Sequence, residues 1–572
     1  MKTKIIIIIT TILLLFNESL YSQQPFMVKD INPGTNTSFN YRPAFTAIGL
    51  TLYFVASDGT NGLELWKSDG TNAGTVMVKD IYPGYQFANV PNNSEPRHLT
   101  NVNGLLYFTA NDGINGTELW KSDGTEVGTV MVKNINIYPN FSDGGSDGSM
   151  LTDVNGVLYF SCDNIDNGYE LWKSDGTATG TVMVKDIYTG NNLNGAPNKS
   201  NPNNFINVNG TLFFAAYNEI NGNELWKSDG TNAGTVMVSD SAGAASTLGS
   251  YHNMTNLNGT LFFSGQSNTF GTELWKSDGT TAGTAMVKDI YPGIIPDSFV
   301  GYSGAPNYLT NVNGTLFFSA CDSEIDSNNR NFELWKTDGT AAGTVKVKEI
   351  RNGTYNYGSF PASLTNANGI LYFAANDGIH GIELWKSDGT ESGTVHIKDL
   401  NAGVSSSEPG QYTYTNGNVY FVANDGIIGQ ELFKTDGTAA GTTGYNIRFL
   451  SESSSPDNLT NVNGKLFFTA TNGGQSGREL WVLDTNSLST DENFINNNKF
   501  SIFPNPVNSI LTIQNLDNKV FDKISITDLT GKKVLEQNNN SNSINVEKLQ
   551  NGMYLLQIST TEENSVIKFI KN

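Results

Sequence analysis

The sequence contains little of what many catalytic and nucleic-acid-binding proteins use. Its 572 residues include only 2 cysteines and 4 histidines, and no histidine stands in an H-E-x-x-H or similar metal-binding spacing. Positive charge is also scarce, because 34 Lys and Arg face 55 Asp and Glu, for a formal net charge of -21. Zinc chemistry is therefore not expected, and long-range attraction to DNA, RNA or an anionic membrane surface is excluded.

Helical periodicity is absent as well. No stretch repeats apolar residues every 3.6 positions, whereas alternating, β-branched and aromatic runs bounded by Gly, Asn and Asp occur throughout. One formal G-x-S-x-G spans Gly144 to Gly148, but it lies in a Gly- and Ser-rich stretch with no helix after it to form a nucleophile elbow. The sequence predicts an all-β chain without a serine-hydrolase motif.

The two cysteines, Cys162 and Cys321, occupy corresponding strands of repeats three units apart. In a ring they would be too distant for a disulfide, so we expect small buried side chains, with pairing between chains as the alternative.

The N-terminus predicts export. Lys2 and Lys4 precede an apolar run from Ile5 to Phe16, and a polar stretch follows it. The run is too short for a bilayer, which takes about 20 residues. We expect residues 1–22 to be a signal peptide and the mature chain to have no transmembrane segment.

A repeated phrase dominates the next 460 or so residues. "ELWKSDGT" starts at Glu64 and returns eight times with small changes, the last as "ELWVLD" from Glu479. Each copy follows a segment like "LTNVNGTLFFSA", and all but the last precede one like "GTVMVKDI". Asn-Gly joins the first two predicted strands in eight of nine units, the strongest two-residue hairpin signal. Four short strands per unit are typical of a β-propeller blade.

Period-2 geometry predicts the register of the third and fourth strands. If Trp66 faces Met77, Glu64 faces Lys79, and the same offset holds in five other units. The chain opens with a lone fourth strand, "PFMVKD", and the ninth unit lacks one. The same register puts Met27 opposite Trp481 and Lys29 opposite Glu479. We therefore expect one propeller of nine four-stranded blades over residues 23–486, closed by the N-terminal strand; an open solenoid or two smaller rings are the alternatives.

These repeats resemble the family named for its ELWxxDGT motif, found in exported bacterial surface proteins; Phe433 and Val482 to Leu483 depart from the motif. The resemblance implies no particular activity. The Asp of each "SDGT" is expected to start a turn, since no segment has the ligand spacing of an EF-hand loop. We expect no cofactor, with structural calcium as an open alternative.

After an Asn-rich linker, residues 487–499, the last 73 residues predict a small antiparallel β-sandwich. This segment, residues 500–572, resembles the type A C-terminal sorting domain of the type IX secretion system. The matching positions are Pro504, Asn505, Pro506, the Asp528 to Gly531 turn, Leu549, Gly552, Met553, Tyr554 and the terminal Lys568 to Lys571. The resemblance implies that the type IX machinery and a surface peptidase are partners. It also implies that a Gram-negative bacterium secretes the protein or holds it on its outer-membrane surface.

The connections between units vary most, and in a propeller they emerge on one face. Their Tyr, Asn, Asp and Gly residues suit sugar or protein surfaces. The candidate binding residues are Tyr85, Tyr138, Tyr302 and Tyr308. No catalytic or metal-binding residue is predicted. We expect a non-catalytic binding or adhesion module for a glycan or protein; the alternative is a secreted carbohydrate-active enzyme, a glycoside hydrolase or lyase, with carboxylates in the central channel.

Overall fold

The chain divides into two compact units, Met1–Glu492 and Asn493–Asn572. The computed structural model describes residues 24–39, 44–87, 90–136, 145–239, 253–267, 269–296, 298–326, 329–351, 357–448, 452–473, 476–486, 500–504, 506–515, 523–528, 532–537, 542–559 and 564–571. Within these ranges, no helix has the length and apolar character needed to cross a membrane. The predicted signal peptide, residues 1–22, and linker, residues 487–499, lie outside them.

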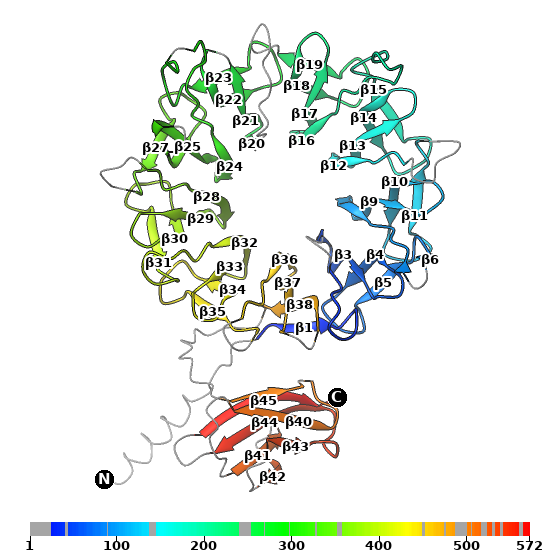
Figure 1. Ribbon diagram of the computed structural model, residues 1–572, viewed down its shortest axis with the longest axis vertical. Helices are drawn as coiled ribbons and strands as arrows, with labels where there is room; N and C mark the ends of the chain where they lie inside the picture. The colour runs from blue at the N-terminus through cyan, green and yellow to red at the C-terminus, as the bar shows by residue number, and fades with distance from the viewer. Residues whose placement is uncertain are drawn as a thin grey trace, which may run out of the picture. The chain divides into compact units, whose positions relative to one another are not determined.

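In the first unit, the described residues form nine four-stranded antiparallel sheets that follow one another around a central opening (Figure 1). The first strands are β2 (Thr46–Ile48), β8 (Arg97–Val102), β12 (Ser149–Val154), β16 (Asn203–Val208), β20 (Met254–Leu257), β24 (Asn307–Val312), β28 (Ala362–Ala367), β32 (Gly410–Thr415) and β36 (Asp457–Val462). The second strands are β3 (Thr51–Ser57), β9 (Leu105–Asn111), β13 (Val157–Asn164), β17 (Thr211–Asn218), β21 (Thr260–Ser267), β25 (Thr315–Asp326), β29 (Ile370–Asn376), β33 (Asn418–Asn424) and β37 (Lys465–Thr471).

The motif "ELWK", or its variants "ELFK" in β34 and "ELWV" in β38, forms the third strand of each sheet. The third strands are β4 (Leu63–Ser68), β10 (Thr117–Ser122), β14 (Gly168–Ser174), β18 (Gly222–Ser228), β22 (Gly271–Ser277), β26 (Asn329–Thr337), β30 (Ile382–Ser387), β34 (Gln430–Thr435) and β38 (Arg478–Asp484). The fourth strands are β5 (Val76–Lys79), β11 (Val130–Lys133), β15 (Val182–Lys185), β19 (Val236–Ser239), β23 (Ala285–Lys288), β27 (Val345–Lys348), β31 (Val395–Lys398), β35 (Thr443–Tyr445) and, beside β38, β1 (Phe26–Lys29). First strands lie nearest the opening and fourth strands at the circumference (Figure 1).

Both predicted turns are present. Asn103 and Gly104 have φ of 53° and 85°, the left-handed conformation that an Asn-Gly hairpin turn requires. In the turn after the third strand, the Asp69 carboxylate accepts hydrogen bonds from the backbone N–H and the hydroxyl of Thr71, at 2.8 and 2.7 Å. The "SDGT" aspartate is thus occupied by turn formation.

The predicted register is half right. Trp66 lies opposite Met77, as expected, but Lys79 lies opposite Leu65 rather than Glu64. A β-bulge adds one residue, Val78, to the fourth strand between Lys79 and Met77, and this shift recurs in other sheets. The predicted Glu–Lys pairs are therefore wrong.

The lysines link neighbouring sheets instead. The ammonium group of Lys79 donates to the Thr129 carbonyl of the next sheet at 2.9 Å, and that of Lys67 donates to the Gly124 carbonyl at 2.8 Å. The same two links recur from sheet to sheet. Trp120 packs with Leu65 and Val78 of the preceding sheet, so the aligned tryptophans fill the cores between sheets, as predicted.

The first and last sheets are joined in the same way. Strand β1 pairs antiparallel with β38, and Met27 lies opposite Trp481 as predicted. Lys29 lies opposite Leu480, not Glu479, because the bulge is repeated here. Its ammonium group donates to the Thr75 carbonyl of the first sheet at 2.8 Å. One core combines residues of both sheets, including Val28, Phe54, Trp66, Phe467 and Val482.

The glutamate of each motif is buried. All nine are at most 1% exposed: Glu64, Glu118, Glu170, Glu224, Glu273, Glu333, Glu383, Glu431 and Glu479. The Glu64 carboxylate accepts hydrogen bonds from the Ile81 N–H at 2.9 Å, the Ser94 N–H at 3.1 Å and the Ser94 hydroxyl at 2.5 Å. Burial raises the pKa of the Glu64 carboxyl to about 7, and these hydrogen bonds oppose that rise.

The second unit has two antiparallel sheets around one core. One contains β39 (Phe500–Phe503), β40 (Ile510–Asn515) and β43 (Ser543–Asn545), and the other β42 (Lys533–Gln537), β41 (Lys523–Asp528), β44 (Gly552–Ser559) and β45 (Asn564–Lys571). Leu511 and Ile544 of the first sheet share this core with Ile524 and Leu556 of the second. These sheets agree with the predicted sandwich.

The β1–β38 pairing predicts that two neighbouring residues of β1 differ in their effect on stability. Val28 is 4% exposed and packs in the core of the first and last sheets, whereas Phe26 is 47% exposed. We expect Val28→Ala to lower the free energy of unfolding by about 1–3 kcal/mol, and Phe26→Ala to change it little. Chemical denaturation of both variants checks this; equal stabilities would mean that β1 does not hold the last sheet.

The buried glutamates predict a pH dependence. An acid whose pKa is raised in the folded state favours folding at low pH, and this contribution is lost as pH rises from the ordinary value of about 4.5 through about 7. Each such group contributes up to about 1.4 kcal/mol of lost stability per pH unit in that window. Glu64→Gln should therefore flatten the decline in unfolding free energy between pH 5 and 7. Parallel profiles for variant and wild type would contradict this assignment.

Candidate functional site

For eight of the nine fourth strands, the connection to the next sheet is fixed at its described ends by one buried carboxylate. Glu64 binds Ile81 where the connection begins and Ser94 where it ends. Glu479 does the same with the Ile31 N–H at 3.0 Å and the Ser38 hydroxyl at 2.6 Å. Equivalent donors meet six other motif glutamates. The residues between the fixed ends can vary while the sheets and the ends of the connection stay in place, which is typical of binding loops.

A β-bulge follows seven of the nine connections, at the start of the first strand of the next sheet. Its first residue has a φ between 55° and 59° and is never glycine. These bulge residues are His98, Met150, Asn204, Tyr308, Ser363, Gln411 and Asn458. The left-handed conformation costs a non-glycine residue roughly 1 kcal/mol or more and is often kept at functional sites. One backbone geometry thus presents seven side chains of five chemical kinds on the strands nearest the opening.

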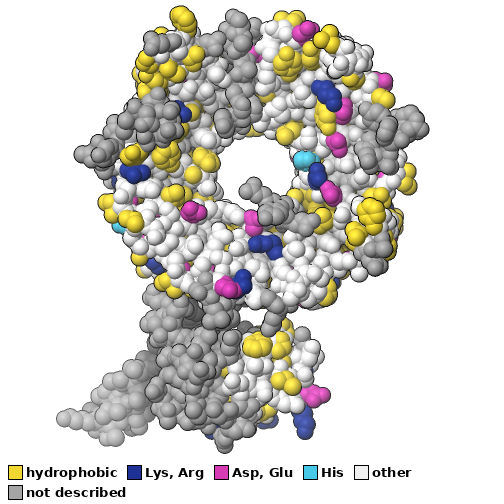
Figure 2. Space-filling model, viewed as in Figure 1, with side chains coloured by type: hydrophobic (Ala, Val, Ile, Leu, Met, Phe, Trp, Pro, Cys, Tyr) yellow, Lys and Arg dark blue, Asp and Glu magenta, His cyan; other side chains and the backbone are white. Residues whose placement is uncertain are grey.

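Two neighbouring bulges, at Gln411 and Asn458, contact each other. The Gln411 amide donates to the Asp457 carboxylate at 2.7 Å, and its oxygen accepts from the Asn458 N–H at 2.7 Å. A hollow of about 320 Å³ lies here, lined by Ala44, Phe45, Gln411, Tyr412, Thr413, Asn458, Leu459 and Thr460. Charged side chains are scattered over the face in view in Figure 2, and some of them lie beside the opening. None of the residues that line this hollow is charged, so the hollow suits uncharged, hydrogen-bonding ligands.

The structure separates the predicted tyrosines. Tyr308 is a bulge residue and 42% exposed. Tyr302 stacks on Tyr291, with ring centroids 4.3 Å apart and planes at 16°, so one face of its ring is covered. Tyr85 lies on a hairpin of β6 (Tyr85–Phe87) and β7 (Val90–Pro91) and is 62% exposed. Tyr138 lies outside the described residues. The described tyrosines do not form one site.

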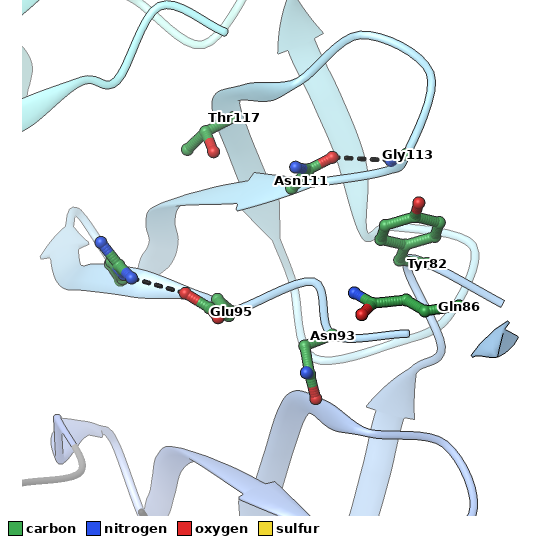
Figure 3. A pocket seen from close by; sticks show the side chains of 8 residues that line it. Tyr82, Gln86, Asn93, Glu95, Asn111, Gly113 and Thr117 are labelled. Carbon is green, nitrogen blue, oxygen red and sulfur yellow. Dashed lines mark hydrogen bonds and ion pairs between the residues drawn. The ribbon is translucent and has the colours of Figure 1, made fainter. Parts of the chain in front are cut away.

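A second hollow, of about 270 Å³, follows β5. It is lined by Tyr82, Gln86, Asn93, Glu95, Arg97, Asn111, Gly113 and Thr117, which come from one connection and the adjoining β9–β10 hairpin (Figure 3). Glu95 and Arg97 form an ion pair at 2.5 Å. Tyr82 is not among the residues predicted from the sequence, because the "YPG" that contains it is part of the repeat.

Two carboxylates near this hollow have different surroundings. Desolvation, then the charge of Asp163, raises the pKa of Asp147, while Arg97 and Lys199 oppose the rise. The Asp163 carboxylate pairs with the Lys199 ammonium group at 3.2 Å. Neighbouring carboxyls with unlike environments are the arrangement that acid–base catalysis uses.

The remaining polar motifs have structural roles. Ser146, the serine of the G-x-S-x-G pattern, is fully buried and donates to the Glu118 carboxylate at 2.8 Å. Cys162 and Cys321 are buried and free, and burial raises the pKa of both thiols. Among the described residues, no three or more His, Cys, Asp or Glu side chains gather where they could hold a metal ion.

The sorting-motif residues occupy the second unit. Pro504 and Pro506 are exposed and flank the turn between β39 and β40, and Gly552 begins β44 opposite Lys571 of β45. The Tyr554 hydroxyl donates to the Gln550 carbonyl at 2.9 Å, and its ring stacks on Phe569. Lys568 pairs with Leu555 across β45 and β44. Asn505 and Gly531 lie outside the described residues.

Comparisons with known proteins bear on part of the chain. Over 92 residues it is 35% identical to an ulvan lyase of Nonlabens ulvanivorans, a match that spans 16% of each protein. Among solved structures, PorZ, a surface component of the type IX secretion system of Porphyromonas gingivalis, has a TM-score of 0.34 and 12% identity over 92% of this chain and 75% of its own. A puromycin-hydrolyzing peptidase of Mycobacterium tuberculosis has a TM-score of 0.33 and 10% identity over 66% and 57%. Similarities this weak leave the first unit to be interpreted from its own residues.

The second unit is assigned by its family. Residues 501–572 match the family described as the secretion system C-terminal sorting domain. Such a domain engages the type IX secretion machinery. These residues are a C-terminal sorting domain, and the protein is secreted to the cell surface or outside of a Gram-negative bacterium of the Bacteroidetes type.

Proposed function

We propose that the first unit is a single nine-bladed propeller, closed by its N-terminal strand, that binds a glycan or protein at the bacterial surface without catalysis. The β1–β38 pairing, the core shared by the first and last sheets and the recurrent lysine links support the closed ring. The seven bulge residues carry the binding proposal. They vary in chemistry at a fixed, strained backbone position beside the opening.

The carboxylates favour binding over catalysis. The glutamates common to all nine repeats are buried and hold the connections, so they are unavailable to a substrate. The loop and bulge side chains are mostly uncharged, and the net charge of -21 opposes polyanionic ligands. An adhesion role at the surface follows from this chemistry and from export.

A second candidate is a carbohydrate-active enzyme. Asp147 and Asp163 are the carboxyls that could act as acid and base, because desolvation raises the pKa of Asp147 whereas Asp163 pairs with the Lys199 ammonium group. The likeness to a lyase over 92 residues points the same way. In this case Arg97 and Lys199 would hold the substrate near the two carboxyls.

Export completes the proposal. Residues 1–22 would direct the chain to the periplasm and be removed, and residues 487–499 would link the propeller to the sorting domain. A surface peptidase would then remove the sorting domain, leaving residues 23–486 on the surface or released.

A glycan array and a polysaccharide-degradation assay on the secreted protein separate the two candidates. We expect binding without product formation. Asp147→Asn should leave binding within about threefold of wild type, because Asp147 serves the enzyme hypothesis alone. Product formation that Asp147→Asn abolishes would establish the enzyme and refute the binding module.

If the bulge residues bind the ligand, relieving the backbone strain at one of them should raise stability and weaken binding. Tyr308→Gly should raise the free energy of unfolding by up to about 1 kcal/mol, because glycine adopts a φ of 56° without the cost that tyrosine incurs. The same change should weaken ligand binding. Tyr308→Ala keeps the strain and serves as the control, with weaker binding and no gain in stability. Unchanged binding in both variants would exclude Tyr308 from the site.

A further inference from the structure

The hollow after β5 has the features of a small, specific site. Tyr82, Gln86 and Asn93 come from the connection after β5, and Asn111, Gly113 and Thr117 come from the β9–β10 hairpin (Figure 3). Its volume of about 270 Å³ is at the small end of ligand pockets, which span about 300–1,000 Å³. A hollow of this volume has room for one ring of a ligand rather than for a large molecule.

The Tyr82 ring is fixed in place by a glycine. A Cβ at Gly113 would stand 2.1 Å from the ring, so only a residue without a side chain allows this position. The N–H of Gly113 in turn donates to the Asn111 side-chain oxygen at 2.7 Å, which leaves the Asn111 amide nitrogen as a donor at the hollow. The aromatic ring and the amide are therefore oriented before any ligand arrives.

In another repeat, the tyrosine that corresponds to Tyr82 has an aromatic ring stacked on it. Tyr291 occupies the place of Tyr82 in its own connection, and the Tyr302 ring stacks on it. The N–H of Tyr302 donates to the Gly293 carbonyl, as the N–H of Asn92 donates to the Gly84 carbonyl, so positions 302 and 92 correspond. The Asn92 amide donates to the Pro83 carbonyl at 3.0 Å, and among the described residues no aromatic ring stacks on Tyr82.

The polar groups around the hollow match vicinal hydroxyls. Amides of Gln86, Asn93 and Asn111 offer donors and acceptors, and the Glu95–Arg97 pair offers both with no net charge. The Asn93 oxygen already accepts from the Leu63 N–H at 2.8 Å, which orients its amide nitrogen as a donor. A hydroxyl donates one hydrogen bond and accepts two, so a ring bearing several hydroxyls can pair with all these groups.

We propose that this hollow binds one ring of a neutral saccharide, with the sugar's C–H face on Tyr82 and its hydroxyls on the surrounding amides and the Glu95–Arg97 pair. The assignment rests on the proposed binding function and specifies its ligand class and one subsite. Tyr82 supplies the apolar contact, and the amides of Gln86 and Asn111 form hydrogen bonds with the sugar hydroxyls. The lack of net charge at the hollow selects neutral over charged sugars.

The test is calorimetric titration of the secreted protein with the neutral oligosaccharide that gives the strongest signal on a glycan array. We expect Tyr82→Ala to weaken binding at least about tenfold, and Tyr82→Phe to stay within about threefold, because the ring face is retained. Gln86→Ala, at an exposed position of the β6–β7 hairpin, should weaken binding several-fold with an unchanged melting temperature. Tyr291→Ala, whose ring partner is Tyr302, is the matched control and should bind like wild type.

The outcomes separate this subsite from the wider proposal. Normal saccharide binding by both Tyr82→Ala and Gln86→Ala would overturn the subsite and leave a glycan-binding protein whose site lies elsewhere. Binding of a protein but of no saccharide would overturn the ligand class and keep the binding module. Absence of any ligand would refute both.

Discussion

The buried glutamate is the constraint on which the rest of the first unit depends. A carboxylate withdrawn from water is costly unless hydrogen bonds satisfy it, and here the donors are the first and last residues of one connection. Glu64 therefore needs the connection, and the connection is held by Glu64. Because the contacts go to backbone N–H groups and one small hydroxyl, they fix the ends of the connection while leaving its middle unrestricted. The repeats therefore share their strands and the fixed ends of their connections, and they differ in the residues between those ends.

Much of this frame could be predicted from the sequence. Local signals carried the prediction: Asn-Gly for the inner hairpin, alternation for the strands and the Trp66–Met77 register. The Glu–Lys pairs could not be predicted, since a β-bulge at Val78 shifts the fourth strand by one residue and no glycine marks it. Burial of the glutamate was also missed, because a charged residue is normally assigned to the surface.

The candidate site was less accessible to sequence reasoning. A repeated Ser-x-Pro, as in Ser94 to Pro96, precedes most bulges and is the signal that could have located them. Tyr82 was overlooked for a physical reason: its availability depends on Gly113 beneath it and on an asparagine, not a tyrosine, at position 92. These residues lie far enough apart in the chain that only the fold brings them together. By contrast, the sorting domain could be recognised from its motif residues, and residues 501–572 match the secretion system C-terminal sorting domain family.

The pairing of β1 with β38 also determines when the fold can be finished. Ser38 and Glu479, which are 441 residues apart in sequence, hydrogen-bond at 2.6 Å beside this pair, so the first connection has its carboxylate only after the last repeat exists. A chain interrupted before β38 would expose an unpaired edge on β1 and lack the glutamate that holds its first connection. The β1–β38 pairing therefore requires that the whole first unit is present. Because the paired residues lie far apart in the sequence, we expect this pairing to be a late step in folding.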